Sequence, residues 1–119
     1  MIRGSADPVI GIEAAGVLAE MGRDDGLQLV QRLLNEKRRV IRELAALALP
    51  AFAKRHASEV LEGLRKAAAD DEWTVRIGAL DALRRIGTAD ATAVARTLCQ
   101  DRASVVRTAA DREVGCARK

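Results

Sequence analysis

The chain has 119 residues, 20 basic against 17 acidic side chains, and only one Phe, one Trp and no Tyr. Its length fits one domain with a modest core, and its formal net charge of +3 is spread over interspersed charges that create no strong field for a polyanion. Ala and Leu favour helices, whereas β-strands and surfaces that bind single-stranded nucleic acid are rich in aromatic residues. The composition therefore predicts a helical domain, and it disfavours a β-rich fold and single-strand binding.

A phrase of apolar and small residues recurs four times along the chain. Its copies begin at Ile10, Ile41, Val75 and Val106, which sets a nearly constant period. A period of this size predicts a stack of small helical units, because each unit buries its apolar face against its neighbours. We expect a single domain over residues 1–119, with units at about 5–35, 36–70, 71–100 and 101–119.

The first helix of each unit is predicted from its apolar face and its end signals. Asp7 followed by Pro8 should start the first one, since aspartate caps an N-terminus and proline fits the first turn. Gly22 and Gly87 should end two of these helices, because glycine accepts the left-handed conformation. The repeated face comprises Ile10, Ala14, Val17, Leu18 and Met21; Ile41, Ala45, Ala48, Leu49 and Phe52; and Val75, Ala79, Ala82, Leu83 and Ile86.

A second helix is predicted in three of the units, at equal distances from the repeated phrase. Its apolar positions are Leu29, Val30, Leu33 and Leu34; Val60, Leu61 and Leu64, with Arg65 as the exception; and Val94, Ala95, Leu98 and Cys99. Pro50 should bend or end the first helix of the second unit, because proline removes a backbone donor. Asp70 or Asp71 opens the third unit and Asp101 the fourth, which holds a first helix only.

Residues 70–87, which read DDEWTVRIGALDALRRIG, closely resemble a HEAT repeat, most of all the short bacterial variety seen in phycobilisome lyases. The resemblance spans roughly residues 5–115. It implies an all-α superhelix, a right-handed α-solenoid of about three and a half helical hairpins whose second helices line the concave side. Because the family acts mostly as a protein-binding scaffold without shared catalytic residues, the resemblance implies no enzyme, cofactor or metal.

The resemblance also implies structural ion pairs between units. The family usually has an Asp before the first helix and an Arg after the first apolar residue of that helix. Here the implied pairs are Asp71 with Arg76 and Asp101 with Arg107, and Arg42 holds the position in the second unit. These arginines are expected to tie repeats together rather than to bind a ligand.

The residues that could carry chemistry form no catalytic or metal-binding pattern. His56 is the only histidine and lies in a polar turn, where we expect it to be solvated. Cys99 and Cys116 have no redox or metal spacing, so we expect free thiols, with Cys99 buried as a small hydrophobe and Cys116 at the surface. Free thiols, no signal peptide and no membrane-spanning run together predict a cytoplasmic protein.

The predicted partner contacts are polar positions that flank the apolar face of the second helices. Trp73 has two open interpretations, either packing into the groove between units or presenting an exposed anchor. With this residue, the candidates for partner binding are Gln28, Gln31, Arg32, Glu59, Glu62, Trp73, Thr92, Arg96 and Thr97.

The function predicted from these patterns is a non-enzymatic scaffold that binds another protein, or that stands as a part of a longer repeat protein, with no membrane contact. One alternative is a nucleic-acid-binding module like the HEAT-like DNA glycosylases. Basic doublets such as Arg84–Arg85 could contact a phosphate backbone, although acidic residues lie between these doublets. Another alternative, a bilin lyase-like enzyme or assembly factor, rests on repeat similarity alone.

The last predicted helix, from about residue 103 to 115, has no second helix to cover it. Its apolar residues Val105, Val106, Ala110 and Val114 exceed what one neighbouring helix is expected to hide. We therefore expect self-association or another contact through this helix, unless its polar residues form a cap.

Overall fold

The structure is a computed structural model that describes residues 11, 12, 16 and 25–116. These residues contain helices and no strand. The helix start predicted at Asp7 and Pro8, the end predicted at Gly22 and the apolar face between them lie outside the described residues. The elements are α2 (Leu27–Leu33), α3 (Arg39–Ala48), η2 (Leu49–Phe52), α4 (Ala57–Ala68), α5 (Trp73–Ile86), α6 (Ala89–Arg96), η3 (Thr97–Gln100) and α7 (Ser104–Val114), where η marks a 3-10 helix.

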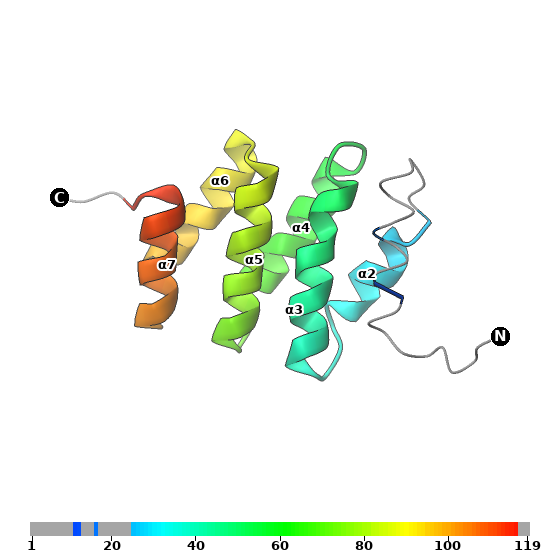
Figure 1. Cartoon of the computed structure of the whole chain (residues 1–119), viewed down its shortest axis with the longest axis horizontal. Helices are drawn as coiled ribbons and strands as arrows, with labels where there is room; N and C mark the ends of the chain where they lie inside the picture. The colour runs from blue at the N-terminus through cyan, green and yellow to red at the C-terminus, as the bar shows by residue number, and fades with distance from the viewer. Residues whose placement is uncertain (1–10, 13–15, 17–24, 117–119) are drawn as a thin grey trace.

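The helices form two layers. In Figure 1, α3, α5 and α7 stand side by side in one row, and α2, α4 and α6 lie behind them. Within the first row α5 contacts both α3 and α7, and across the layers it contacts α4 and α6. First helices of the units thus form one layer and second helices form the other.

The core lies between the layers and matches the repeated apolar face. In α5, Val75, Ala79 and Leu83 are fully buried, and Ala45 and Leu49 are fully buried in the preceding unit. Because these side chains recur at helical spacing, one face of each helix is apolar along its whole length. The predicted cores of the second and third units are confirmed, with Ala48 and Ile86 only partly buried.

The second helices pack as their spacing predicts. Val30 and Leu34 of the first unit are buried, as are the corresponding Val60 and Leu64, while the exceptional Arg65 is exposed. Close packing is needed at Gly63, where a Cβ atom would lie 3.0 Å from methyl carbons of two leucines. A side chain there would push those leucines apart.

Two predicted helix ends are confirmed. The regular part of α3 ends at Ala48 and continues as η2, whose second residue is Pro50. Proline cannot donate the backbone hydrogen bond that would extend the α-helix. Gly87 follows α5 with φ of 70°, the left-handed conformation in which glycine avoids the steric penalty of a Cβ atom.

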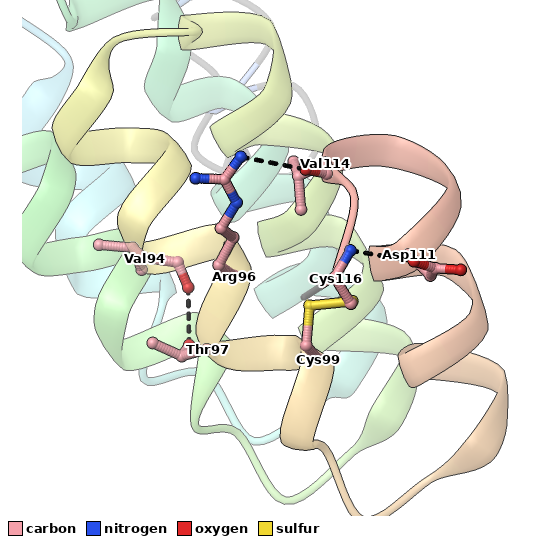
Figure 2. Close-up of a disulfide and its surroundings, with 7 residues drawn as sticks. All are labelled: Val94, Arg96, Thr97, Cys99, Asp111, Val114 and Cys116. Atoms are coloured by element: carbon pink, nitrogen blue, oxygen red, sulfur yellow. Dashed lines mark hydrogen bonds between the residues drawn. A yellow bond between two sulfur atoms is a disulfide. The ribbon is translucent and has the colours of Figure 1, made fainter. Parts of the chain in front are cut away.

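The expectation of free thiols is wrong. Cys99 and Cys116 form a disulfide whose Cα atoms are 5.7 Å apart (Figure 2). Cys99 lies in η3, and Cys116 follows the end of α7, where Gly115 has φ of 72°. The turn at Gly115 brings the second cysteine back towards the preceding unit. The argument from free thiols to a reducing compartment therefore fails.

The helices of the described residues include no membrane span, because they are too short or too polar.

Candidate functional site

Two arginines, Arg42 and Arg76, join successive units through carboxylates. The guanidinium of Arg42 donates from Nε and Nη2 to the carboxylate of Asp70, over 2.8 and 3.1 Å. Arg76 donates in the same two-pronged way to Asp101, over 2.7 and 3.0 Å. Each arginine therefore reaches the aspartate that opens the following unit, an arrangement that matches the planar fork of a guanidinium.

The expected partners Asp71–Arg76 and Asp101–Arg107 do meet, but through backbone carbonyls and not through the carboxylates. Arg76 Nη1 donates to the backbone carbonyls of Asp70 and Asp71, over 2.8 and 3.2 Å, while its other edge faces Asp101. Arg107 Nη1 likewise donates to the backbone carbonyl of Asp101, over 2.8 Å. An arginine thus holds its own loop through carbonyls and the next loop through a carboxylate, so its role is structural, as expected.

The inter-unit pairs are buried to different degrees. Arg76 is 2% exposed and is the one buried charged residue among those described. Burial alone would raise the pKa of Asp101, but hydrogen bonds from Arg76 and from the backbone N–H of Ala103 outweigh it and lower the pKa. For Asp70, burial is likewise outweighed, by bonds from Arg42 and the N–H of Glu72, so its pKa is also lowered.

Stability is expected to fall in acid because of these two carboxylates. Both pKa values are lowered by folding, so the stabilisation is complete above the ordinary aspartate pKa of about 3.9 and is lost as the pH falls through the lowered values. Urea unfolding between about pH 7 and pH 3 should show this loss. Asp101→Asn should flatten the acid branch of the profile. An unchanged unfolding midpoint across that range, or an equally steep profile in the variant, would contradict the assignment.

The layer of second helices carries eight of the nine candidate contact residues. Three of them, Gln31, Glu59 and Glu62, line a groove of about 480 Å³ between α2 and α4, together with Leu34, Ser58, Gly63 and Lys66. The other five do not line this groove. Two of those have intramolecular bonds: Arg96 Nη2 donates to the carbonyl of Val114 over 3.4 Å, and Thr97 Oγ1 donates to the carbonyl of Val94 over 2.6 Å (Figure 2).

Trp73 belongs to the opposite layer. It begins α5, is 46% exposed, and lines a groove of about 470 Å³ between α5 and α7. Its two interpretations are therefore compatible, since the indole lies in an inter-unit groove and keeps an exposed surface. The other residues lining this Trp73 groove are Ile77, Ser104, Val105, Thr108, Ala109 and Arg112.

Comparison with known families shows the family to which the chain belongs. The family model for HEAT repeats matches residues 51–114, which is more than half of the chain. The chain belongs to the HEAT repeat family. The match runs from η2 to the end of α7 and so includes the Arg76–Asp101 pair and the Trp73 groove. No curated protein and no solved structure gives a significant match.

Two valines of this HEAT repeat protein are exposed at the surface: Val105, which is among the residues named from the sequence, and Val40, which is not. Val105 is 48% exposed and lines the Trp73 groove, and Val40 is 50% exposed at the same position of the second unit. Each valine immediately precedes the repeated phrase, at Val106 and Ile41 respectively. For Val40 this position is a signal that could have been recognised, because it falls outside the apolar face of the helix.

The apolar residues of α7 do not form one exposed strip. Although more apolar residues are expected here than one neighbouring helix would hide, Val106 and Ala110 are fully buried and Val114 is partly buried. The helix turns these residues towards α5, α6 and η3, and only Val105 stays largely exposed.

Neither groove has the composition of a metal site. Across residues 11, 12, 16 and 25–116, no three His, Cys, Asp or Glu side chains are grouped so that they could hold a metal ion. His56 lies directly before α4 with 32% of its side chain exposed, and its Nδ1 is 3.7 Å from Glu59.

Proposed function

We propose that this protein is a non-enzymatic HEAT-repeat scaffold that binds another protein, with its helices wound as a right-handed α-solenoid of about three and a half hairpins. HEAT repeats commonly mediate protein–protein interaction, and residues 51–114 match their family model. The observation that carries the proposal is the half-exposed Trp73 in the groove between α5 and α7.

The Trp73 groove has the features of a protein-binding hot spot. Tryptophan is enriched at such sites because its large ring buries much apolar surface while its N–H keeps a polar contact. Val105 adds a second exposed apolar side chain, and both walls of the groove are helices. A groove with helical walls loses little conformational freedom when a partner binds.

The side chains that line the Trp73 groove indicate which kind of partner segment would fit it. Trp73, Ile77 and Val105 supply an apolar floor, and Arg112, whose side chain is 70% exposed, is the charged residue of the lining. This combination fits a protein segment that places an apolar side chain between α5 and α7 and a carboxylate near Arg112.

The groove between α2 and α4 offers a second contact of the opposite charge. Glu59 and Glu62 contribute two carboxylates there, beside the single ammonium group of Lys66. A basic or polar segment fits this lining better than an acidic one. The two grooves lie on different layers, so one partner could use either without touching the other.

Affinity purification with tagged full-length variants tests both surfaces. We expect the wild-type protein to recover a specific protein, and Trp73→Ala to reduce its recovery at least about tenfold, because truncation of a hot-spot residue removes about 2 kcal/mol or more. Val40→Ala is the matched control, since it shortens an exposed apolar side chain elsewhere on the same layer. Circular dichroism would verify that each variant is folded.

The same experiment has results that contradict the proposal. Undiminished recovery with Trp73→Ala, combined with loss in a Glu59→Lys, Glu62→Lys double variant, would move the site to the other layer. Recovery of nucleic acid instead of a protein would favour the nucleic-acid reading. Failure of every bait to retain a specific protein would overturn the scaffold function.

A further inference from the structure

We propose that the Cys99–Cys116 disulfide is a redox-controlled staple that keeps α7 docked, and that its reduction releases this helix and dismantles the Trp73 groove. The part that concerns partner binding rests on the function proposed above. The part that concerns α7 does not, because docking of the helix can be measured without any partner.

The disulfide is placed to control the end of α7. It joins η3, which follows α6, to the residue after the Gly115 turn (Figure 2). The backbone N–H of Cys116 donates to Asp111 Oδ1 over 2.9 Å, so the turn is anchored to α7 itself. The covalent link therefore connects the C-terminal end of α7 to the preceding hairpin.

The non-covalent docking of α7 is weak compared with that of the preceding first helix, α5. Its buried side chains are one valine and two alanines, Val106, Ala109 and Ala110. In α5 the buried residues include two leucines and a valine. Because hydrophobic stabilisation scales with buried apolar area, α7 gains much less from packing than α5 does.

Polar contacts add little to the docking of α7. The ion pair between Arg84 and Glu113, at 2.9 Å, has side chains that are 44% and 33% exposed. Surface pairs of this kind contribute little to stability. The bond from Arg96 to the carbonyl of Val114 is long, at 3.4 Å. The disulfide is therefore the strongest single link that holds this end of the helix.

The chemistry requires a cellular dithiol as reductant. Both cysteines are only partly buried, so a small thiolate can approach the bond. The thiolate attacks one sulfur, the Cys99–Cys116 bond breaks, and the other cysteine leaves as a thiolate that takes up a proton. The second thiol of the reductant then displaces the first cysteine, so that two electrons pass to the protein and the dithiol becomes a disulfide. A disulfide oxidant of the same class reverses the reaction.

Release of α7 would remove one wall of the Trp73 groove. Val105, Thr108 and Arg112 all belong to α7, whereas Trp73 and Ile77 belong to α5. With α7 undocked, Trp73 and Ile77 remain on the surface of α5 without an opposite wall. Local opening of a weakly packed helix needs no unfolding of the remaining core.

Limited trypsin digestion of the full chain measures the docking of α7. Arg107 and Arg112 lie in α7 and are exposed, and Arg65 is an exposed control site in α4. We expect reduction to accelerate cleavage after Arg107 and Arg112 by at least about tenfold, while cleavage after Arg65 stays within about twofold. A Cys99→Ser, Cys116→Ser variant should be cleaved rapidly at the α7 sites with and without reductant.

Trp73 provides an independent readout, because it is the only tryptophan of the chain and borders α7. Acrylamide quenching of its fluorescence should increase on reduction of the wild type and should not respond to reductant in the double serine variant. Equal cleavage and quenching in both redox states would overturn the proposal. Equal acceleration of cleavage at Arg65 would also overturn it, because the effect of reduction would then be global. Detection of two free thiols in protein purified without reductant would overturn it as well, because the disulfide would then be absent.

Discussion

Replacement of Asp101 by alanine is expected to lower the free energy of unfolding by about 3–5 kcal/mol. The variant would leave the guanidinium of Arg76, which is 2% exposed, buried without its carboxylate. It would also remove the acceptor for the backbone N–H of Ala103, which is 2.9 Å from Asp101. An uncompensated buried charge is more costly than the loss of the attraction itself, so one substitution should remove a large part of the stability of a domain this size.

Urea unfolding of three variants separates the cost of the stranded charge from other effects. Asp70→Ala should cost less than Asp101→Ala, since the side chains of the Arg42–Asp70 pair are 15% and 13% exposed and water can solvate the remaining arginine. Adding Arg76→Met to Asp101→Ala should recover part of the loss, because the buried charge is then removed. A loss below about 1 kcal/mol for Asp101→Ala would show that Arg76 finds another partner or reaches water.

The parts of the fold that depend on local spacing could be predicted from the sequence. Val75, Ala79 and Leu83 follow one helical face, and the same face recurs at Ala45 and Leu49. Burial of such a face is a property of the helix itself, so its position does not depend on knowing the neighbours. The stops at Pro50 and Gly87 were predictable for the same reason, because each follows from the backbone of one residue.

The contacts between residues of different units could not be predicted in the same way. The resemblance to HEAT repeats implies a pair of Asp71 with Arg76, but the long side chain of Arg76 extends across to Asp101 in the next unit. The disulfide likewise arises from a turn after α7 that brings distant residues together, and the spacing of Cys99 and Cys116 contains no sign of it. Sequence periodicity fixes what each helix buries but not which loop lies beside it.

The candidate site was predicted only in part, because the sequence does not show which surface residues of neighbouring units come together in a groove. Trp73 stands at the first turn of its helix, where the helical pattern leaves its direction open. The structure separates it from the eight candidates on the second helices and places it beside Val105. Self-association through α7 stays a prediction, although one position of this helix weighs against it.

That position is Asp111. On α5, Gly78 faces α3, and Leu80 lies two residues further on, so Leu80 points to the opposite side of the helix, towards α7. Asp111 stands at the same place in the repeat on α7, where it therefore faces away from α5. A carboxylate in place of a buried leucine gives α7 a polar outer side, which is the character of a capping repeat.

Replacement of Leu83 by alanine is expected to destabilise the protein by about 2–5 kcal/mol, because the side chain is fully buried and its removal leaves a cavity that neighbouring helices fill only partly. Leu49 occupies the equivalent position of the preceding unit and is also fully buried, so Leu49→Ala should have a comparable effect. Leu61→Ala, at a partly buried leucine of α4, should cost clearly less and serves as the control. Urea unfolding followed by circular dichroism would give the three values, with the slope of the transition as a check on two-state behaviour. A loss below about 0.5 kcal/mol for Leu83→Ala would mean that the repeat register places a different residue at the centre of the core.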